Sequence, residues 1–253
     1  MNRRELITGL GVLGVGRLAR GSQQSATPAN AQAVAHAPED STALPPVVAG
    51  IQLPDSAIVR KAMQLAQNAY PLYLLNHSIR TFLLGSLVGR VRGQHFDEEI
   101  LLLACILHDL GLTDRYQGDL PFEIQGAQAA RQFLQENAYS ENKIQLVWDG
   151  IAMHPLAIGQ FKQPEVALVG EGAGADVFGP DLSEIKKADV DEVVKAFPRL
   201  GFKVAFVDTC AEVVRRHPRG ASRSFMRDIG ERRVPGFRPA NICDLITQSS
   251  FSG

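Results

Sequence analysis

The sequence predicts an all-α fold, a bundle of helices, and three observations support this fold class. From Asp55 onward, apolar residues recur at steps of three and four, which is the period of one face of an α-helix. In the same region, no two runs of alternating apolar and polar residues are joined by a two-residue turn, and no segment repeats. Proline and glycine interrupt the pattern at intervals and mark where the predicted helices end.

Length, composition and charge describe one well-filled domain without a strongly charged surface. The chain has 253 residues, of which 45% are hydrophobic, and its net charge is −1, from 27 acidic and 26 basic side chains. This balance gives no reason to expect a nucleic acid or an anionic membrane as a partner. The three cysteines show no metal-binding or disulfide spacing, and Cys105 lies in an apolar run typical of a protein core.

Residues 1–45 do not resemble part of a folded core and are predicted to be an export-signal-like segment followed by a disordered linker. Arg3 and Arg4 precede a short apolar run, residues 6–16, which is too short to span a bilayer. Residues 21–46 are rich in Ser, Gln, Ala and Pro. We expect a twin-arginine-like signal that leads to the periplasm, without stable membrane insertion. The alternative is a disordered tail on a cytoplasmic protein.

Residues 46–253 are predicted to form the folded domain, with an irregular C-terminal segment. Its helices are expected at residues 56–69, 72–92, 97–110, 122–137, 140–154, 164–178, 184–197 and 202–217. The segment that follows is rich in arginine, which alternates with Ser, Phe, Asp, Glu and Gly. We expect a solvated surface with local ion pairs there and not a site for nucleic acid.

The predicted helix 72–92 carries the first candidate metal ligand. Its inner stripe, at steps of four, four, three and four, consists of Tyr73, His77, Thr81, Leu84 and Val88. His77 is therefore expected to point inward. Asn76 and Arg80 lie at the same level of the helix, so polar groups gather there. The alternative is a core histidine hydrogen-bonded to a carbonyl group.

The predicted helix 97–110 contains the densest apolar run of the chain, and a His–Asp pair follows it. Residues 101–107 are all apolar, His108 and Asp109 come next, and Gly111 is typical of a helix end. Burying an imidazole and a carboxylate without partners costs several kcal/mol. A divalent metal ion satisfies both groups, because it binds neutral imidazole and ionised carboxylate directly.

Two ionisable residues at helix ends are further candidates for the site. Glu123 opens the predicted helix 122–137, where the helix dipole alone favours an acidic side chain. His154 closes the inner face of the predicted helix 140–154 and precedes Pro155, which places it at a helix end that can face a cavity. Spacing leaves open whether Glu123 faces the site, and a solvent-facing position is the alternative for His154.

The predicted helix 164–178 places a carboxylate on an apolar face. This face consists of Val166, Val169, Ala173 and Asp176. Gly172 and Gly174 weaken the helix by roughly 1 kcal/mol each relative to alanine, which is tolerable where another backbone or an ion approaches closely. The alternative is that the glycines mark a loop and leave Asp176 in solvent.

Four short motifs together resemble the HD superfamily of metal-dependent hydrolases, and more narrowly its cyanamide hydratase-like branch. The motifs are Asn76-His77-Ser78-Ile79-Arg80, Leu107-His108-Asp109-Leu110-Gly111-Leu112-Thr113, Phe122-Glu123-Ile124-Gln125-Gly126-Ala127 and Gly174-Ala175-Asp176-Val177-Phe178-Gly179. The pattern of the superfamily is a histidine, then an adjacent His-Asp pair, then a distant aspartate. The likeness covers roughly residues 55–250, and the combination is specific although each motif is short.

The resemblance implies an all-α HD-domain helical bundle with one divalent metal ion, zinc or iron, with manganese or magnesium as alternatives. On this chain the metal ligands would be His77, His108, Asp109 and Asp176. The branch also implies hydration of a small cyanamide- or nitrile-like molecule, whereas phosphohydrolases that act on nucleotides dominate the superfamily. The sequence leaves a homo-oligomer open.

The expected chemistry starts from a metal-activated water that attacks the substrate. A bound divalent metal lowers the pKa of water from about 16 toward about 7. Asp109 would steer this water or accept its proton, and His154 or Glu123 would relay protons. Arg80 or Asn76 would stabilise the negative charge that develops on the substrate.

Three functions compete at this point. The first is hydration or hydrolysis of a small neutral molecule, which Asn76 and Thr113 would contact. It is favoured by apolar surroundings in which Arg80 and Arg115 are the cations close in sequence to the motifs. The second is a phosphohydrolase, whose phosphate the arginines of residues 215–238 would bind by folding back over the cavity. The third is a non-catalytic metal-binding or ligand-sensing domain, which a small or dry cavity would indicate.

Overall fold

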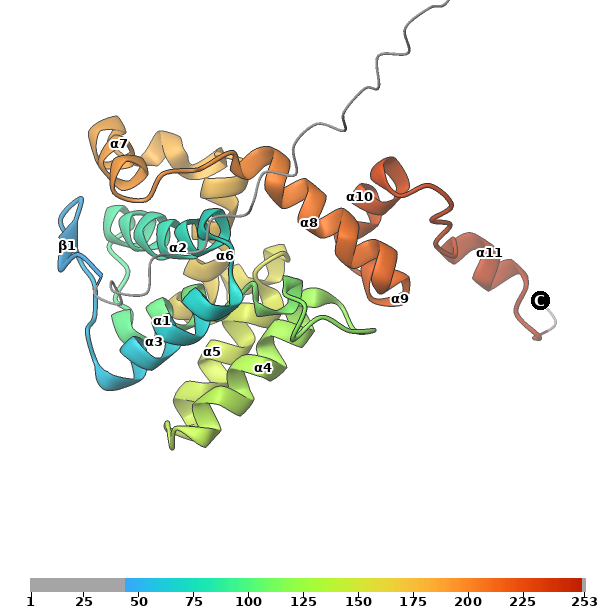
Figure 1. Ribbon diagram of the computed structural model, residues 1–253, viewed down its shortest axis with the longest axis horizontal. Coiled ribbons are helices and arrows are strands. Elements are labelled where there is room, and N and C mark those ends of the chain that lie inside the picture. The colour runs from blue at the N-terminus through green and yellow to red at the C-terminus, as the bar shows by residue number, and fades with distance from the viewer. Residues whose placement is uncertain (1–43, 252–253) are drawn as a thin grey trace, which may run out of the picture. The chain divides into compact units, whose positions relative to one another are not determined.

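The structure, a computed structural model, describes residues 44–251, apart from the side chains of residues 157, 180 and 181. All of them belong to one compact unit of the chain, residues 34–253. They form eleven α-helices, three 3₁₀ helices and one two-stranded hairpin, which confirms the all-α prediction (Figure 1).

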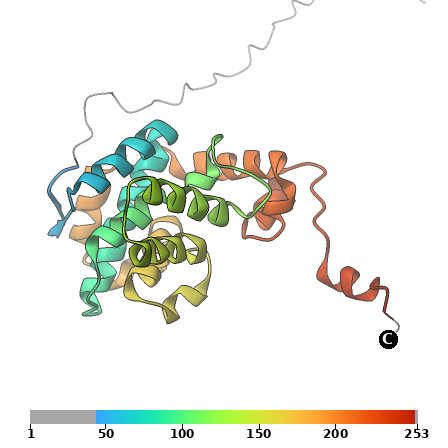
Figure 2. The same ribbon diagram turned by 90° about the horizontal axis from the view of Figure 1, so that it is seen from below.

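The eight predicted helices are all present, and each end lies within three residues of its expected position. They are α1 (Ala57–Ala69), α2 (Leu72–Val91), α3 (Glu98–Leu107), α4 (Phe122–Glu136), α5 (Glu141–Met153), α6 (Pro164–Val177), α7 (Lys187–Ala196) and α8 (Phe202–Arg216). The 3₁₀ helices are η1 (Leu110–Leu112), η2 (Ala157–Phe161) and η3 (Pro180–Glu184). Figure 2 shows the same arrangement from below, with α4 and α5 lying side by side.

Two regions differ from the sequence prediction. A hairpin of β1 (Val47–Val48) and β2 (Ile51–Gln52) precedes the first predicted helix. Its two-residue turn has Ala49 and Gly50 in the left-handed region, at φ 50° and 70°. The segment predicted to be irregular contains three short helices: α9 (Pro218–Ala221), α10 (Met226–Arg233) and α11 (Ile242–Thr247).

The central element is α2, in which every residue from Tyr73 to Gly89 is buried. It packs along α6, and glycine makes the approach close enough for the two backbones to touch. A Cβ atom on Gly172 would lie 2.1 Å from the carbonyl oxygen of Thr81, and one on Gly85 would lie 2.5 Å from that of Leu168. This contact brings His77 on α2 beside Asp176 on α6.

A second close approach fixes the His–Asp pair at the end of α3. The apolar residues 101–107 of this helix are all buried, and the chain turns into η1 directly after Asp109. A Cβ atom on Gly111 would lie 1.9 Å from the carbonyl oxygen of Phe122, and one on Gly126 would lie 2.9 Å from that of His108. Both glycines therefore allow the start of α4 to lie directly against the turn that carries His108 and Asp109.

Two of the three glycines of α6, Gly172 and Gly174, should respond oppositely to the same substitution. We expect Gly172→Ala to lower the free energy of unfolding by roughly 1–3 kcal/mol, because the methyl group meets the backbone of α2. Gly174→Ala is the matched control, because its Cβ atom would meet nothing within 4 Å, and helix propensity should stabilise it by up to about 1 kcal/mol. Urea unfolding followed by circular dichroism measures both values. Equal midpoints would contradict the assigned helix contact.

The N-terminal predictions concern residues that the structure does not describe. The twin-arginine-like signal and linker were predicted for residues 1–45, of which residues 1–43 lie outside the described part of the chain. Among the described residues, no helix combines the length and the apolar character that a membrane span requires.

Candidate metal centre

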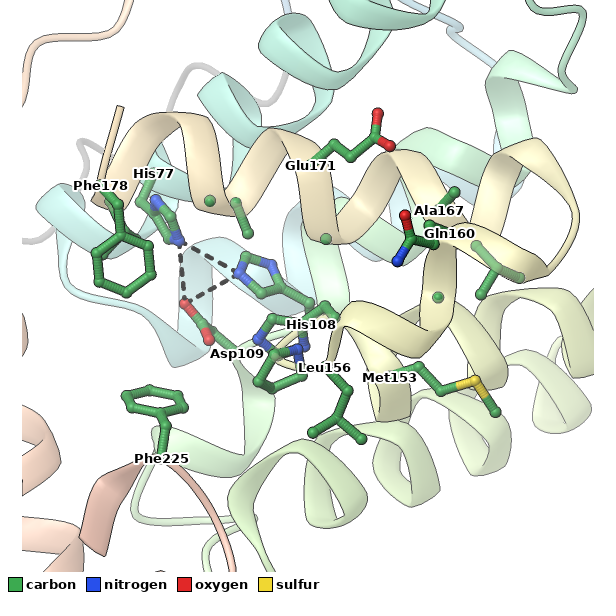
Figure 3. A pocket seen from close by; sticks show the side chains of 18 of the residues that line it. His77, His108, Asp109, Met153, Leu156, Gln160, Ala167, Glu171, Phe178 and Phe225 are labelled. Atoms are coloured by element: carbon green, nitrogen blue, oxygen red, sulfur yellow. Dashed lines mark hydrogen bonds and ion pairs between the residues drawn. The ribbon is translucent and has the colours of Figure 1, made fainter. Parts of the chain in front are cut away.

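Three side chains of metal-ligating types converge in the interior, one from the second turn of α2 and two from the residues that directly follow α3 (Figure 3). The Nε2 atoms of His77 and His108 lie 3.3 Å apart. The Oδ2 atom of Asp109 lies 3.3 Å from Nε2 of His108 and 3.7 Å from Nε2 of His77. All three residues are 1% exposed, so water does not solvate these groups freely.

The outer hydrogen bonds of the two imidazoles show where their protons lie. Nδ1 of His108 is 2.7 Å from the carbonyl oxygen of Cys105, which can only accept, so Nδ1 carries the proton. Nδ1 of His77 likewise donates to Oδ2 of Asp176, at 2.7 Å. In the neutral rings both Nε2 atoms are then unprotonated, and their lone pairs face each other and Asp109.

This donor set fits a divalent cation. Two imidazole lone pairs and a carboxylate meet with no proton between them, and Oδ2 of Asp109 is buried without a hydrogen bond. Burial, together with the neighbouring His77, lowers the pKa of His108 to about 3, while burial raises the pKa of Asp109. A cation offsets the lone-pair repulsion and the desolvation of the carboxylate, which is the usual role of a metal at such a cluster.

Asp176 occupies a different place from the one the sequence predicted. It is buried and lies next to His77, as expected, but both of its carboxylate oxygens accept hydrogen bonds. Arg80 donates from Nε to Oδ1 at 2.8 Å and from Nη2 to Oδ2 at 2.7 Å, and Arg199 donates to Oδ1 at 2.6 Å. In this geometry Asp176 lies outside the three-residue cluster and holds Nδ1 of His77, the position that an outer partner of a metal ligand occupies.

Charge explains why Asp176 stays ionised in this environment. Burial alone would raise its pKa, but the hydrogen bonds from Arg80 and His77 outweigh burial and hold the pKa below its ordinary value. Arg80 is 0% exposed and also donates to the carbonyl oxygens of Phe197 and Pro198. Its predicted role in stabilising charge on the substrate is corrected to one of holding Asp176.

Three residues of the site escaped the sequence reasoning. Phe202 lies against the His77 ring, with centroids 4.7 Å apart, and stacks on Phe206 at 5.0 Å. The guanidinium carbon of Arg199 lies 4.9 Å from the centroid of Phe202. The spacing of the two phenylalanines, four residues apart at the start of a predicted helix, was a usable signal, whereas Arg199 lies in a loop without periodicity.

A pocket of about 540 Å³ opens onto the three ligands. His77, His108, Asp109 and His154 line it, and most of the remaining wall is apolar and comes from α6, from residues 153–160 and from three phenylalanines. The phenylalanines are Phe178, Phe206 and Phe225. The ligands therefore face a space that can hold an organic molecule.

Comparison with known proteins agrees with this geometry. Residues 74–192 match the model of the HD domain family. These residues form an HD domain. Over 210 residues, 79% of the chain, the sequence is 26% identical to cyanamide hydratase DDI2 and to cyanamide hydratase DDI3 of Saccharomyces cerevisiae, and it covers 89% of each.

A further relative is an uncharacterized protein of Clostridium beijerinckii. It is 28% identical over 82 residues, 31% of this chain, and the match spans about half of the relative, 52%. The HD domain and the cluster of His77, His108 and Asp109 together support a metal-dependent hydrolase.

The other predicted site residues of the HD domain divide into one that reaches the pocket and three that do not. His154 lines it, with its ring centroid 4.9 Å from that of His108. Asn76 donates to the carbonyl oxygen of Pro198, and Thr113 donates to that of Leu110. Neither these two nor Glu123 is among the described residues that line this pocket, so the predicted substrate contacts of Asn76 and Thr113 are not part of it.

Glu123 is buried at the start of α4, and burial raises its pKa to about 7. Because the folded-state pKa exceeds the ordinary value of 4.5, ionisation of Glu123 lowers the free energy of unfolding of the protein as the pH rises from about 4.5 through 7. We expect the stability of Glu123→Gln relative to the wild type to increase over that pH interval, by on the order of 3 kcal/mol in the free energy of unfolding. Urea unfolding at pH 4.5, 6 and 8 measures the difference. A difference that does not change with pH would contradict the assignment.

Proposed function

We propose that the protein is a metal-dependent hydratase that adds water to the carbon–nitrogen triple bond of a neutral, cyanamide- or nitrile-like molecule. The observation that carries the proposal is a cluster of candidate metal ligands that faces a mostly apolar pocket. The one arginine or lysine among the described residues that line this pocket, Arg92, is already paired with carboxylates. The likeness to two yeast proteins named cyanamide hydratase supports the same class of substrate.

The charges around the pocket favour a neutral substrate over a phosphate ester. Among the described residues that line the pocket, Arg92 is the one arginine or lysine. It pairs with Glu171 at 2.8 Å and donates two hydrogen bonds to Glu184, at 2.9 Å and 2.7 Å. A phosphate would have to displace these carboxylates, because phosphate sites present several cationic donors to the ligand.

The arginine-rich C-terminal segment does not supply the missing cations. Of residues 215–238, all of which the structure describes, only Phe225 lines the pocket. The ion pairs of its arginines lie outside the pocket. Arg215 and Arg216 bind Glu212, Arg216 also binds Asp114, Arg227 binds Glu231, and Arg233 binds Asp208. The phosphohydrolase that the sequence left open therefore has no support from the pocket.

Each residue of the centre has a defined task in the proposed hydration. His77 and His108 each donate from Nδ1 to an outer partner, so their Nε2 atoms are aimed inward. A divalent cation bound there supplies Lewis acidity and acidifies a water molecule at neutral pH. Asp109 orients that water. Nδ1 of His154 donates to the carbonyl oxygen of Ile151, so its Nε2 is an acceptor that would take a proton from the attacking water and then give it to the substrate nitrogen.

A substrate panel and metal analysis test the proposal together. We expect about one divalent ion per chain in the purified protein, and conversion of cyanamide to urea or of small nitriles to amides, detected by mass spectrometry. Nucleoside monophosphates and generic phosphate esters should not release phosphate. Phosphate release without any hydration would overturn the proposal, and a metal-loaded protein with neither activity would favour the non-catalytic metal-binding domain.

A further inference from the structure

The pocket is far larger than cyanamide requires. Its volume of about 540 Å³ lies within the roughly 300–1,000 Å³ that holds drug-sized ligands. Cyanamide is close in size to a few water molecules, each of which occupies about 30 Å³ in the liquid. Most of the space would then hold water against an apolar wall, which is unfavourable and gives no selectivity.

The pocket extends along one helix, with the ligand cluster at one end. The α6 residues that line it run from Val166 to Val177, and eleven steps of about 1.5 Å span roughly 16 Å. Figure 3 shows His77 and Phe178 at one end of this helix, and Ala167 with Gln160 at the other. A molecule that reacts at the cluster therefore has a mostly apolar channel for whatever is attached to its reacting carbon, with Gln160 and the paired Arg92 and Glu171 as its polar lining residues.

Gly174 is the residue that widens this channel. The other two glycines of α6 have packing reasons, because Gly170 lies against the backbone of His154 and Gly172 against that of α2, whereas a Cβ atom on Gly174 would meet nothing within 4 Å. A glycine inside a helix costs about 1 kcal/mol relative to alanine, and packing does not explain it here. Because Gly174 lines the pocket, its missing side chain leaves room for a ligand.

We propose that the preferred substrate is an organic nitrile that carries an apolar chain or ring, with the nitrile carbon at the cluster and the apolar part along α6. This inference rests on the proposed hydratase function. The water oxygen forms a C=O double bond with the nitrile carbon, the two π bonds of the triple bond break to leave a C–N single bond, and both water protons end on nitrogen, which gives the carboxamide. No oxidant or reductant is needed.

A homologous series of straight-chain nitriles, from acetonitrile to heptanenitrile, tests the inference. Each buried methylene contributes about 0.8 kcal/mol, so kcat/KM should rise about fourfold per methylene until the chain fills the pocket. The corresponding carboxamides should compete as products, and their inhibition constants should fall with chain length in the same way. Isothermal titration of the carboxamides measures this affinity without turnover.

Filling the channel should remove the dependence on chain length. In Gly174→Leu, the ratio of kcat/KM for hexanenitrile to that for acetonitrile should fall toward one, because the new side chain occupies the channel. Ala167→Leu, at the far end, is a second variant that should affect only the longest chains. Ala188→Leu, on an exposed site of α7 outside the pocket, is the matched control and should keep the wild-type ratio.

The outcomes separate this inference from the proposed function. The inference is supported if the ratio of kcat/KM for a longer nitrile to that for acetonitrile rises with chain length in the wild type and falls toward one in Gly174→Leu. Hydration of cyanamide or acetonitrile with no gain for longer nitriles would overturn the inference and leave the hydratase in place. Failure to hydrate any nitrile or cyanamide would overturn both. Circular dichroism and metal content establish that each variant is folded.

Discussion

His108→Ala should abolish metal binding and activity. The substitution removes one of three ligand atoms that lie within 4.8 Å of one another, and two donors do not define a site for a divalent ion. Loss of an outer partner of a metal ligand usually costs 10–100-fold in metal affinity, so loss of the ligand itself should cost more than about 100-fold. Metal analysis after dialysis and titration with Zn²⁺ or Fe²⁺ measure the effect, and Asp109→Ala should behave in the same way.

Two further variants make this result specific. His95→Ala removes an exposed imidazole that does not line the pocket, and should keep the wild-type metal content. Asp176→Asn tests the corrected role of that residue. An outer partner should leave about one ion per chain at saturation with an affinity reduced 10–100-fold, whereas a ligand would behave like His108. Equal losses in Asp176→Asn and His108→Ala would restore Asp176 to the ligand set.

Arg80→Met should give the largest loss of stability among single substitutions away from the ligands. The guanidinium is fully buried, binds both oxygens of Asp176 and donates to two backbone carbonyls. Its removal leaves a buried carboxylate with less compensation, and breaking a buried pair in this way costs about 3–5 kcal/mol. Chemical denaturation of the metal-free protein measures this cost.

Arg233→Met is the matched control for that prediction. Arg233 pairs with Asp208 across two helices at 2.8 Å, but both side chains are about half exposed, at 47% and 56%. Exposed pairs contribute roughly 0–1 kcal/mol, so this variant should be nearly as stable as the wild type. Similar losses in both variants would show that burial does not distinguish the two pairs.

The fold was predictable because most of its helices bury a continuous stripe. On α1 this stripe consists of Val59, Ala62, Met63 and Ala66. The apolar runs of α2 and α3 are instead buried on every side, so their composition predicted burial and spacing did not select one face. The hairpin at residues 47–52 was missed because its strands are two residues long and its turn is Ala-Gly. In α10 only Met226 and Gly230 are buried, which is too little to form a detectable stripe.

The sequence predicted which polar residues of the site point inward, but not which groups they bond to. Spacing placed Asp176 on an inner face, and the structure agrees. Whether a carboxylate binds a metal or a guanidinium depends on distant residues, and here Arg199 comes from a loop 23 residues further along the chain. Asn76 and Thr113 belong to the same motifs as the ligands but donate to the backbone carbonyls of Pro198 and Leu110, which a motif cannot distinguish from contact with a substrate.

The contact between α2 and α6 indicates the order in which the protein folds and binds its metal ion. His77 and Asp176, which are bonded to each other, are 99 residues apart, and such a long chain loop closes only when many other contacts compensate its entropy. The ribosome must therefore release most of the domain before the centre exists. Metal capture then follows folding driven by apolar contacts, unlike small zinc modules in which the ion itself drives folding. Chelation should accordingly remove the metal ion from the centre while the helical fold is retained.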